Sequence, residues 1–278
     1  MSAPVVLVTG ATGNVGAELV AHLAAAGAAV RALVRKADAT IPPGAQGVVG
    51  DLNAPDTVTP HLEGVRGVFL LSGYTDTPRL IDRMRDAGVE RVVLLSGGSA
   101  VASNLDNAVS RYMVASEQAV RESAVGWTIL RPYAFTSNAL RWLPQLRLGD
   151  AVTLPFADVA NAVIDPYDIA RVAAAALLDA DQGQVYRLSG PESLRPEQQV
   201  QVLGEVLGRD LRFQAQTDEQ ARAEMSAGMP AEYVDAFFSF YVDRTLDESA
   251  VLPTVEEITG TAPRTFREWA RAHRDAFS

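Results

Sequence analysis

The most constraining feature of the sequence is an apolar strand that runs directly into a glycine-spaced turn and then into a helix. Residues 5–9 read VVLVT, glycines follow at positions 10, 13 and 16, and residues 15–26 have the periodicity of an amphipathic helix. Glycine permits the tight turn and lets the backbone approach a pyrophosphate, while the helix N-terminus offers N–H groups and a positive dipole. This strand–turn–helix context predicts a dinucleotide-binding turn, for which the glycines alone would be weak evidence. The residues predicted to contact the cofactor here are Gly10, Thr12, Gly13, Asn14, Val15 and Gly16.

The alternation of short apolar runs with amphipathic stretches continues through the first half of the chain. We expect further strands at 30–34, 48–49, 67–71, 91–95 and 127–130, with helices at 76–87 and 105–123. The pattern predicts an α/β fold, a doubly wound parallel sheet of the Rossmann type with a small, mostly helical C-terminal substrate lobe. Residues 1–150 would form the NADP-binding core, and residues 151–278 would complete that core and form the lobe.

The second half has a different pattern. A helix is expected after Phe135, a strand at 164–168 running into a helix at 169–178, and a late strand at 184–188. From residue 195 onward, helices separated by glycine and proline are expected.

Charge and composition exclude several classes of function. The net charge is −10 and the pI is near 4.8, so no basic face is expected for nucleic acid. The absence of cysteine excludes disulfides and a Cys nucleophile. Residues 217–257 carry a net charge of −8, interpreted either as a solvated helical surface or as a region that repels anionic partners. No signal peptide or membrane span is predicted, so we expect a cytoplasmic location and no membrane partner.

The end of the second predicted strand bears on the choice of cofactor. An NAD site places Asp or Glu there, on the ribose 2′-hydroxyl, whereas this strand runs into Arg35 and Lys36. Guanidinium binds a 2′-phosphate through paired, charged hydrogen bonds. The sequence favours NADP(H) over NAD(H), and the alternative is a solvent-facing basic loop.

The carboxyl ends of the other strands form the rest of the predicted crevice. Asp51 and Leu52 occupy the usual place of an adenine contact, and two further segments end the fourth and fifth strands. The additional residues predicted to bind the cofactor are Leu71, Ser72, Gly73, Ser96, Pro132 and Tyr133.

These pieces resemble the NmrA-like branch of the atypical short-chain dehydrogenases/reductases. The matching segments are VTGATGNVG at 8–16, ALVR at 32–35, GDL at 50–52, WTILRP at 127–132, LSGPE at 188–192, VLGR at 206–209, VEEITG at 255–260 and PRTF at 263–266. The resemblance spans nearly the whole chain and implies a Rossmann domain with a small substrate lobe. That family holds NADPH-dependent reductases of quinones and dyes, and also non-catalytic proteins that bind the dinucleotide and report redox state.

The catalytic pattern typical of such reductases is incomplete. It consists of a Ser followed by Tyr-x-x-x-Lys, in which the lysine lowers the phenol's pKa, but this chain has 23 arginines and one lysine, Lys36. One register pairs Ser99 with Tyr112 and puts Ser116 at the lysine position. The other, set by the spacing from Glu117 to Arg131, puts Val109 and Met113 at the two positions. Tyr112 is therefore the candidate catalytic acid, and the alternative is a helix residue beside the cleft.

Other chemistries have less support in the sequence. The three histidines are scattered, so neither a metal site nor a triad is predicted. Asp165 and Asp168 are interpreted as a turn and helix cap rather than as an acid–base pair. The candidate substrate-binding residues are Tyr74, Ser99 and Phe135, for whose aromatic rings core packing is the alternative.

We therefore expect an NADP(H)-dependent oxidoreductase that transfers hydride to a small, electron-poor, quinone-like or conjugated acceptor. Such an acceptor suits a site without Tyr-x-x-x-Lys, because its reduced form is a stabilised anion that needs little help from a protein acid. The alternative is a non-catalytic NADP-binding redox sensor. No oligomeric state is predicted.

Overall fold

A computed structural model of the chain describes residues 4–101, 105–178 and 182–277. These residues form two compact units that interleave along the sequence. The first unit contains residues 1–97, 112–132 and 166–187, and the second contains 98–111, 133–165 and 188–278. The domain boundary expected between residues 150 and 151 remains a prediction. Each compact unit takes residues from both sides of that position.

The first unit is built on a seven-stranded sheet whose order is β3-β2-β1-β4-β5-β6-β8. Its strands are β1 (Val5–Val8), β2 (Ala29–Val34), β3 (Ala45–Val49), β4 (Val65–Leu71), β5 (Arg91–Leu95), β6 (Gly126–Pro132) and β8 (Gln184–Leu188). The pairings from β3 through β6 are parallel. The order reverses direction between β1 and β4, where a doubly wound sheet forms its ligand crevice. The predicted Rossmann fold is confirmed.

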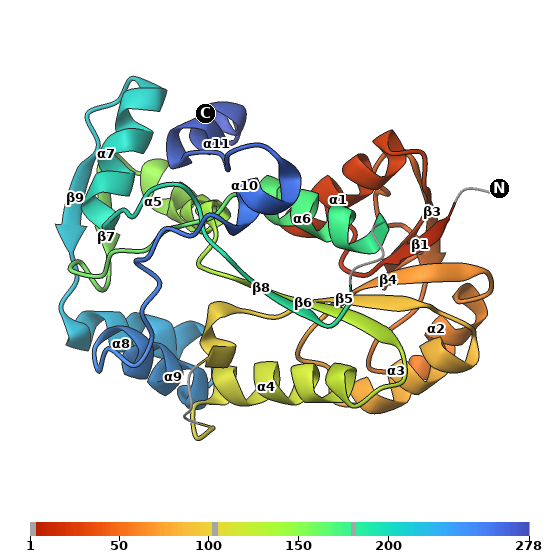
Figure 1. Cartoon of the computed structure of the whole chain (residues 1–278). Helices are drawn as coiled ribbons and strands as arrows, with labels where there is room; N and C mark the ends of the chain where they lie inside the picture. Colours follow the sequence, from red (N-terminus) through yellow and green to blue (C-terminus); the bar gives the residue numbers. More distant parts are fainter. Residues whose placement is uncertain (1–3, 102–104, 179–181, 278) are drawn as a thin grey trace. The chain divides into compact units, whose positions relative to one another are not determined.

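Helices cover both faces of this sheet (Figure 1), with α1 and α6 on one side and α2, α3 and most of α4 on the other. They are α1 (Asn14–Ala25), α2 (Pro55–Val58) with the 3₁₀ turn η1 (Thr59–His61), α3 (Thr77–Asp86), α4 (Ala108–Arg121) and α6 (Pro166–Leu178). The core between the sheet and α3 is apolar: Leu80, Ile81 and Met84 pack with Val68 and Leu70 of β4. Burial on both faces explains why these strands read as continuous apolar runs.

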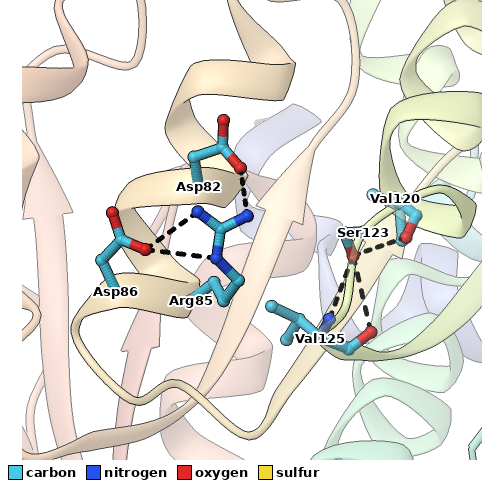
Figure 2. A network of polar contacts seen from close by, with 6 residues as sticks. All are labelled: Asp82, Arg85, Asp86, Val120, Ser123 and Val125. Atoms are coloured by element: carbon cyan, nitrogen blue, oxygen red, sulfur yellow. Dashed lines mark hydrogen bonds and ion pairs between the residues drawn. The ribbon is translucent and has the colours of Figure 1, made fainter.

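Exposed arginines on α3 form surface ion pairs. Arg85 donates to Asp82 and Asp86 (Figure 2), at distances of 2.6 to 3.1 Å. Exposed pairs of this kind contribute at most about 1 kcal/mol each, so they make the helix surface polar rather than hold the fold together.

A serine closes the turn between α4 and β6. The Ser123 hydroxyl lies 2.7 Å from the Val120 carbonyl, to which it donates, and it accepts from the Val125 N–H at 3.3 Å (Figure 2). Val120 and Val125 are both buried, so this small polar turn lets α4 lead directly into an internal strand.

The second unit combines short helices with a two-stranded parallel sheet. Its helical elements are η2 (Gly98–Val101), η3 (Thr136–Trp142), α5 (Leu143–Leu146), α7 (Pro196–Leu207), α8 (Asp218–Gly228), α9 (Ala231–Tyr241), α10 (Thr254–Thr259), α11 (Phe266–Ala272) and η4 (Arg274–Phe277). The sheet pairs β7 (Ala151–Leu154) with β9 (Arg212–Ala215). A core that includes Trp142, Leu203, Phe266 and Trp269 joins η3, α7 and α11.

Two expectations for this half of the chain need correction. The strand predicted at 164–168 is wrong: only Ile164 forms an isolated bridge, to Phe135, and α6 begins at Pro166. Proline suits the first turn of a helix, which ends the extended segment there. The helix expected after Phe135 begins as the 3₁₀ helix η3 and becomes α-helical only at Leu143, where proline occupies the first turn. In the part of the chain that the structure describes, no helix is long and apolar enough to cross a membrane.

Candidate functional site

The glycine-spaced turn between β1 and α1 depends on two glycines that no other residue could replace without distortion. Gly10 has φ +61°, and a Cβ there would lie 2.7 Å from Leu71 Cδ1. A Cβ at Gly16 would lie 2.1 Å from the Gly10 carbonyl oxygen, so Gly16 lets α1 approach the turn. At Gly13 the nearest atom is 3.2 Å away. That atom is the Gly10 carbonyl oxygen, so a Cβ at Gly13 would be crowded, although less severely than one at Gly16, and the exposed Gly13 lets a ligand approach the backbone.

The N-terminus of α1 fits a phosphate group. Gly13 is its N-cap, no side chain caps it, and its first turn contains no acidic residue. Thr12, Gly13 and Asn14 are exposed. A helix end of this kind presents backbone N–H groups and a positive dipole, which are the features that bind the pyrophosphate of a dinucleotide.

Hydrogen bonds bring the ends of the neighbouring strands together at one edge of the sheet. The Leu71 N–H donates to Thr9 Oγ1 at 3.1 Å, and the Ser72 N–H donates to the Leu95 carbonyl at 3.2 Å. The Ser96 N–H in turn donates to the Leu130 carbonyl at 2.8 Å. The segments that the sequence placed at the strand ends therefore do lie beside the glycine turn.

The two cations that follow β2 are exposed. Neither Arg35 nor Lys36 forms a side-chain hydrogen bond or ion pair with any residue that the structure describes. Asp38, also exposed, is the nearest acidic residue along the chain. Two uncommitted cations at this strand end fit the 2′-phosphate of NADP, and their role remains a prediction.

In the segment after β3, the side chains predicted to contact adenine already have partners within the protein. Asp51 Oδ1 accepts the Asn53 N–H at 2.9 Å, and the Asp51 N–H donates to Thr57 Oγ1 at 2.9 Å. The side chain of Leu52 is buried in the core of the first unit. An adenine contact at Asp51 and Leu52 stays a prediction. The groups left to make it are the backbone of these residues and the second carboxylate oxygen of Asp51.

Helix α4 carries the candidate catalytic phenol. Tyr112 is half-buried, and its ring lies 3.4 Å from where a Cβ on Gly73 would stand. Ser116, at the position of the missing lysine, donates to the Tyr112 carbonyl at 2.9 Å and accepts from the Gly73 N–H at 3.1 Å. Its hydroxyl therefore ties α4 to the loop after β4 and supplies no charge to the phenol.

The alternative register places a thioether instead of an ammonium group beside the strand ends. Met113 Sδ lies 3.0 Å from the Ser72 hydroxyl and 3.8 Å from that of Ser96. Neither register puts a cation in the place of the lysine, which agrees with the single lysine of the chain.

A buried ion pair holds α4 against β6. Glu117 accepts two hydrogen bonds from Arg131, at 2.8 and 2.6 Å, and a third from the Ser96 hydroxyl at 2.7 Å. Ser96 was predicted to bind the cofactor. In the structure its hydroxyl belongs to this network, so a contact with the cofactor would use its backbone.

The remaining predicted residues occupy buried or half-buried positions. Pro132 ends β6, and Tyr133 is 2% exposed and donates its N–H to the Leu188 carbonyl. Tyr74 is half-buried against the core of the first unit, and Ser99 is buried in the second unit. Their contacts with a ligand remain predictions.

The polar residues that the sequence offered for other chemistry have structural partners. Asp168 accepts from Arg171 at 2.9 Å, and Asp165 lies 3.6 Å from an Arg264 nitrogen. Within residues 4–101, 105–178 and 182–277, no three His, Asp or Glu side chains lie close enough together to hold a metal ion.

The second unit contains a cavity of about 450 Å³ that the sequence did not reveal. Phe135, a predicted substrate-binding residue, lines it, and nearly half of its lining residues come from η3, the end of β7, α8 and α9. Arg141, Phe156, Phe237 and Tyr241 belong to that wall. These residues come from separate segments and share no motif, so the sequence gave no signal that would group them.

Comparisons with known proteins agree with this geometry. The family model described as NAD(P)H-binding matches residues 10–180, which include the glycine turn and all the strand ends described above. A (4-alkanoyl-5-oxo-2,5-dihydrofuran-3-yl)methyl phosphate reductase of Streptomyces griseus is 38% identical, covering 98% of this chain and 99% of that protein. An NAD(P)H azoreductase of Xenophilus azovorans is 34% identical, with coverage of 98% and 99%.

Solved structures share the fold at low sequence identity. An NADPH-dependent quinone oxidoreductase of Escherichia coli, in complex with NADPH, superposes with a TM-score of 0.78 at 21% identity, covering 97% of this chain and 99% of that one. NmrA, a negative transcriptional regulator in complex with NADP, gives a TM-score of 0.77 at 17% identity, with coverage of 98% and 95%. The NmrA structure shows the shared fold, and the chain belongs to the NAD(P)H-binding family and is an oxidoreductase.

Proposed function

We propose that the protein uses NADPH, in preference to NADH, to reduce a small, electron-poor, conjugated acceptor of the quinone type without a Tyr-x-x-x-Lys pair. The observation that carries the proposal is on α4, where Ser116 and Met113 occupy the two possible lysine positions, so that neither register supplies the lysine of a Tyr-x-x-x-Lys pair. A phenol without such a lysine to lower its pKa is a poor acid at neutral pH.

The cofactor would be held by the first unit. The exposed N-terminus of α1 suits the pyrophosphate, and Arg35 with Lys36 suits the 2′-phosphate. The segments 71–73 and 96, after β4 and β5, would border the nicotinamide half. When bound, the nicotinamide supplies the hydride.

The acceptor class follows from the missing acid. A ketone becomes an alkoxide on reduction and needs a proton at once, whereas a quinone becomes a delocalised anion that water can protonate. The relatives support this class, since one is an azoreductase and a structural neighbour is a quinone oxidoreductase. Phe135, on the wall of the cavity in the second unit, is proposed to contact the acceptor.

The test is anaerobic NADPH oxidation with a quinone, an azo dye, an enone and a simple ketone, using the wild type and Tyr112→Phe. We expect turnover of the conjugated acceptors, with a loss of less than about tenfold in the variant, where loss of a well-placed general acid costs ~10²–10⁴-fold. The ketone should react poorly and suffer more from the substitution.

Two outcomes would overturn the proposal. A thousandfold loss with every acceptor, at unchanged NADPH affinity, would make Tyr112 the catalytic acid. Tight NADPH binding with no turnover of any acceptor would be the behaviour of a sensor, for which NmrA, a regulator that binds NADP, is the structural precedent.

A further inference from the structure

The cavity of the second unit has an aromatic wall suited to a planar ligand. The rings of Phe237 and Tyr241 lie parallel within 16° at 6.3 Å between centroids, and Phe156 lies 5.0 Å from Tyr241. Phe156 has φ +56°, an unusual conformation for a bulky residue, and its ring packs against Phe238 as well as Tyr241. Rigid, flat walls of this kind favour aromatic or conjugated molecules over flexible aliphatic ones.

One guanidinium group stands on this wall. Among the described residues that line the cavity, Arg141 is the only cation, and it forms no hydrogen bond or ion pair with any described residue. Three arginines of the same unit are paired, Arg111 with Glu232, Arg209 with Asp150, and Arg222 with Asp235. Arg141 is exposed and, like Arg147, is not paired with a described residue, so its place on the cavity wall is what distinguishes it. In a chain of net charge −10, an arginine without a carboxylate partner is a position where an anion can bind.

Three titratable groups share this region with Arg141: the Tyr241 phenol and the carboxylates of Glu248 and Glu224. Burial, reinforced by the nearby carboxylate of Glu248, raises the pKa of Tyr241, whereas Arg141 opposes that shift. The phenol therefore stays neutral and does not compete for the guanidinium. Glu224, the acidic residue of the wall, is exposed and accepts a hydrogen bond from Gln216.

A second polar group of the wall has no partner. The Oδ1 atom of Asn161 is inaccessible to solvent and makes no hydrogen bond with any described residue, although the Asn161 backbone pairs with Leu194. A buried amide oxygen without a donor costs about 1–3 kcal/mol. Because that oxygen is closed to solvent, it offers no contact to a ligand in the cavity, and the proposal rests on Arg141 and the aromatic rings.

We propose that this cavity binds an acceptor with a planar conjugated body and one anionic oxygen group, a carboxylate, sulfonate or phosphate, that pairs with Arg141. This inference deepens the proposed function and rests on it for the claim that the bound ligand is reduced. Arginine presents a planar fork of N–H donors that matches two oxygens of such a group, and the aromatic rings hold the conjugated part.

Binding is tested first without cofactor or turnover. Naphthalene-2-sulfonate and the neutral naphthalene-2-methanol are titrated by calorimetry into the wild type, Arg141→Ala and a control, Arg147→Ala. Arg147 is exposed, lies outside the wall and forms no side-chain hydrogen bond or ion pair with a described residue. We expect Arg141→Ala to weaken the sulfonate on the order of ten- to a hundredfold and the alcohol less than twofold.

Turnover is tested with a matched pair of azo dyes, 4-dimethylaminoazobenzene and its 4′-sulfonate. Arg141→Ala should raise KM for the sulfonated dye alone and leave NADPH affinity and the melting temperature unchanged. Glu224→Gln should lower KM for the same dye, because it removes the opposing charge. Equal losses for both members of either pair, or equal effects of Arg147→Ala, would overturn the inference.

The two proposals fail separately. Arg141-dependent binding of naphthalene-2-sulfonate without reduction of either dye would leave the anion site standing and contradict the proposed reductase. Reduction of both dyes, with no effect of Arg141→Ala on the sulfonated member, would support the proposed reductase and contradict the anion site.

Discussion

Arg35 and Lys36 stand exposed where β2 ends, and the choice between NADPH and NADH is a question about these two side chains. Hydrogen bonds to a charged group contribute about 1.5–3 kcal/mol. Arg35→Ala should therefore weaken NADPH binding roughly ten- to a hundredfold and leave NADH binding little changed. Calorimetry with both cofactors measures this, with Asp38→Asn as a neighbouring control that should not weaken NADPH. Equal losses of affinity for the two cofactors would show that Arg35 does not bind the 2′-phosphate.

Gly13 and Gly16 belong to the same turn but differ in how much room a side chain would have there. A side chain at Gly13 meets one atom at 3.2 Å, whereas at Gly16 it would meet backbone at 2.1 Å. Gly13→Val should preserve the circular dichroism spectrum and abolish NADPH binding, because the methyl groups stand where the pyrophosphate approaches. Gly16→Val should destabilise the fold itself. A Gly13→Val protein that binds NADPH at wild-type affinity would make the turn merely structural.

On the scale of elements, the buried pair between Glu117 and Arg131 fastens α4 to β6. The Glu117 side chain is 4% exposed and that of Arg131 is 18% exposed. Glu117→Gln leaves the guanidinium partly buried without its counter-ion, which should lower the free energy of unfolding by about 3–5 kcal/mol. Replacing both residues by Met should recover most of that loss, because two apolar groups of similar volume need no partners.

Urea denaturation of Glu117→Met, Arg131→Met and the double Met variant measures the coupling between the two residues. The serine hydroxyl of Ser96 loses its acceptor in the double variant, so Ser96→Ala in that background serves as the control. Single substitutions that cost less than 1 kcal/mol would show that the pair contributes nothing to fastening the helix.

Elements with strong local signals could be predicted from the sequence. The apolar runs of β1, β4 and β5, followed by glycine or serine, lie where the pattern placed them to within two residues. Strands β7 and β9 were missed because each is four residues long and, among the described strands, they pair only with each other. Most of β9 is also exposed. Their apolar and polar residues carry no period that distinguishes them from loop.

At the scale of the whole molecule, the candidate cofactor site of the first unit and the cavity of the second unit differ in how far the sequence could define them. The cofactor site consists of short segments that each follow one strand, so the fold type alone brings them together. The cavity of the second unit draws Phe135, Phe156 and Tyr241 from segments more than 20 residues apart. Long-range packing of that kind leaves no local pattern, and neither Arg141 nor Asn161 could be singled out before the structure.

The central claim is that the protein delivers hydride from NADPH to an acceptor, and the fate of the hydrogens at the nicotinamide C4 tests it most directly. NADPH labelled with deuterium in the 4R position, and separately in the 4S position, is oxidised with whichever conjugated acceptor turns over, and the NADP⁺ is analysed by mass spectrometry. An enzyme that holds the nicotinamide in one orientation removes hydrogen from one face only, so one label should be lost completely and the other fully retained. The account would be contradicted if NADP⁺ formed no faster than in a mixture of NADPH and acceptor without the protein. It would also be contradicted if the NADP⁺ from both isomers retained part of the label.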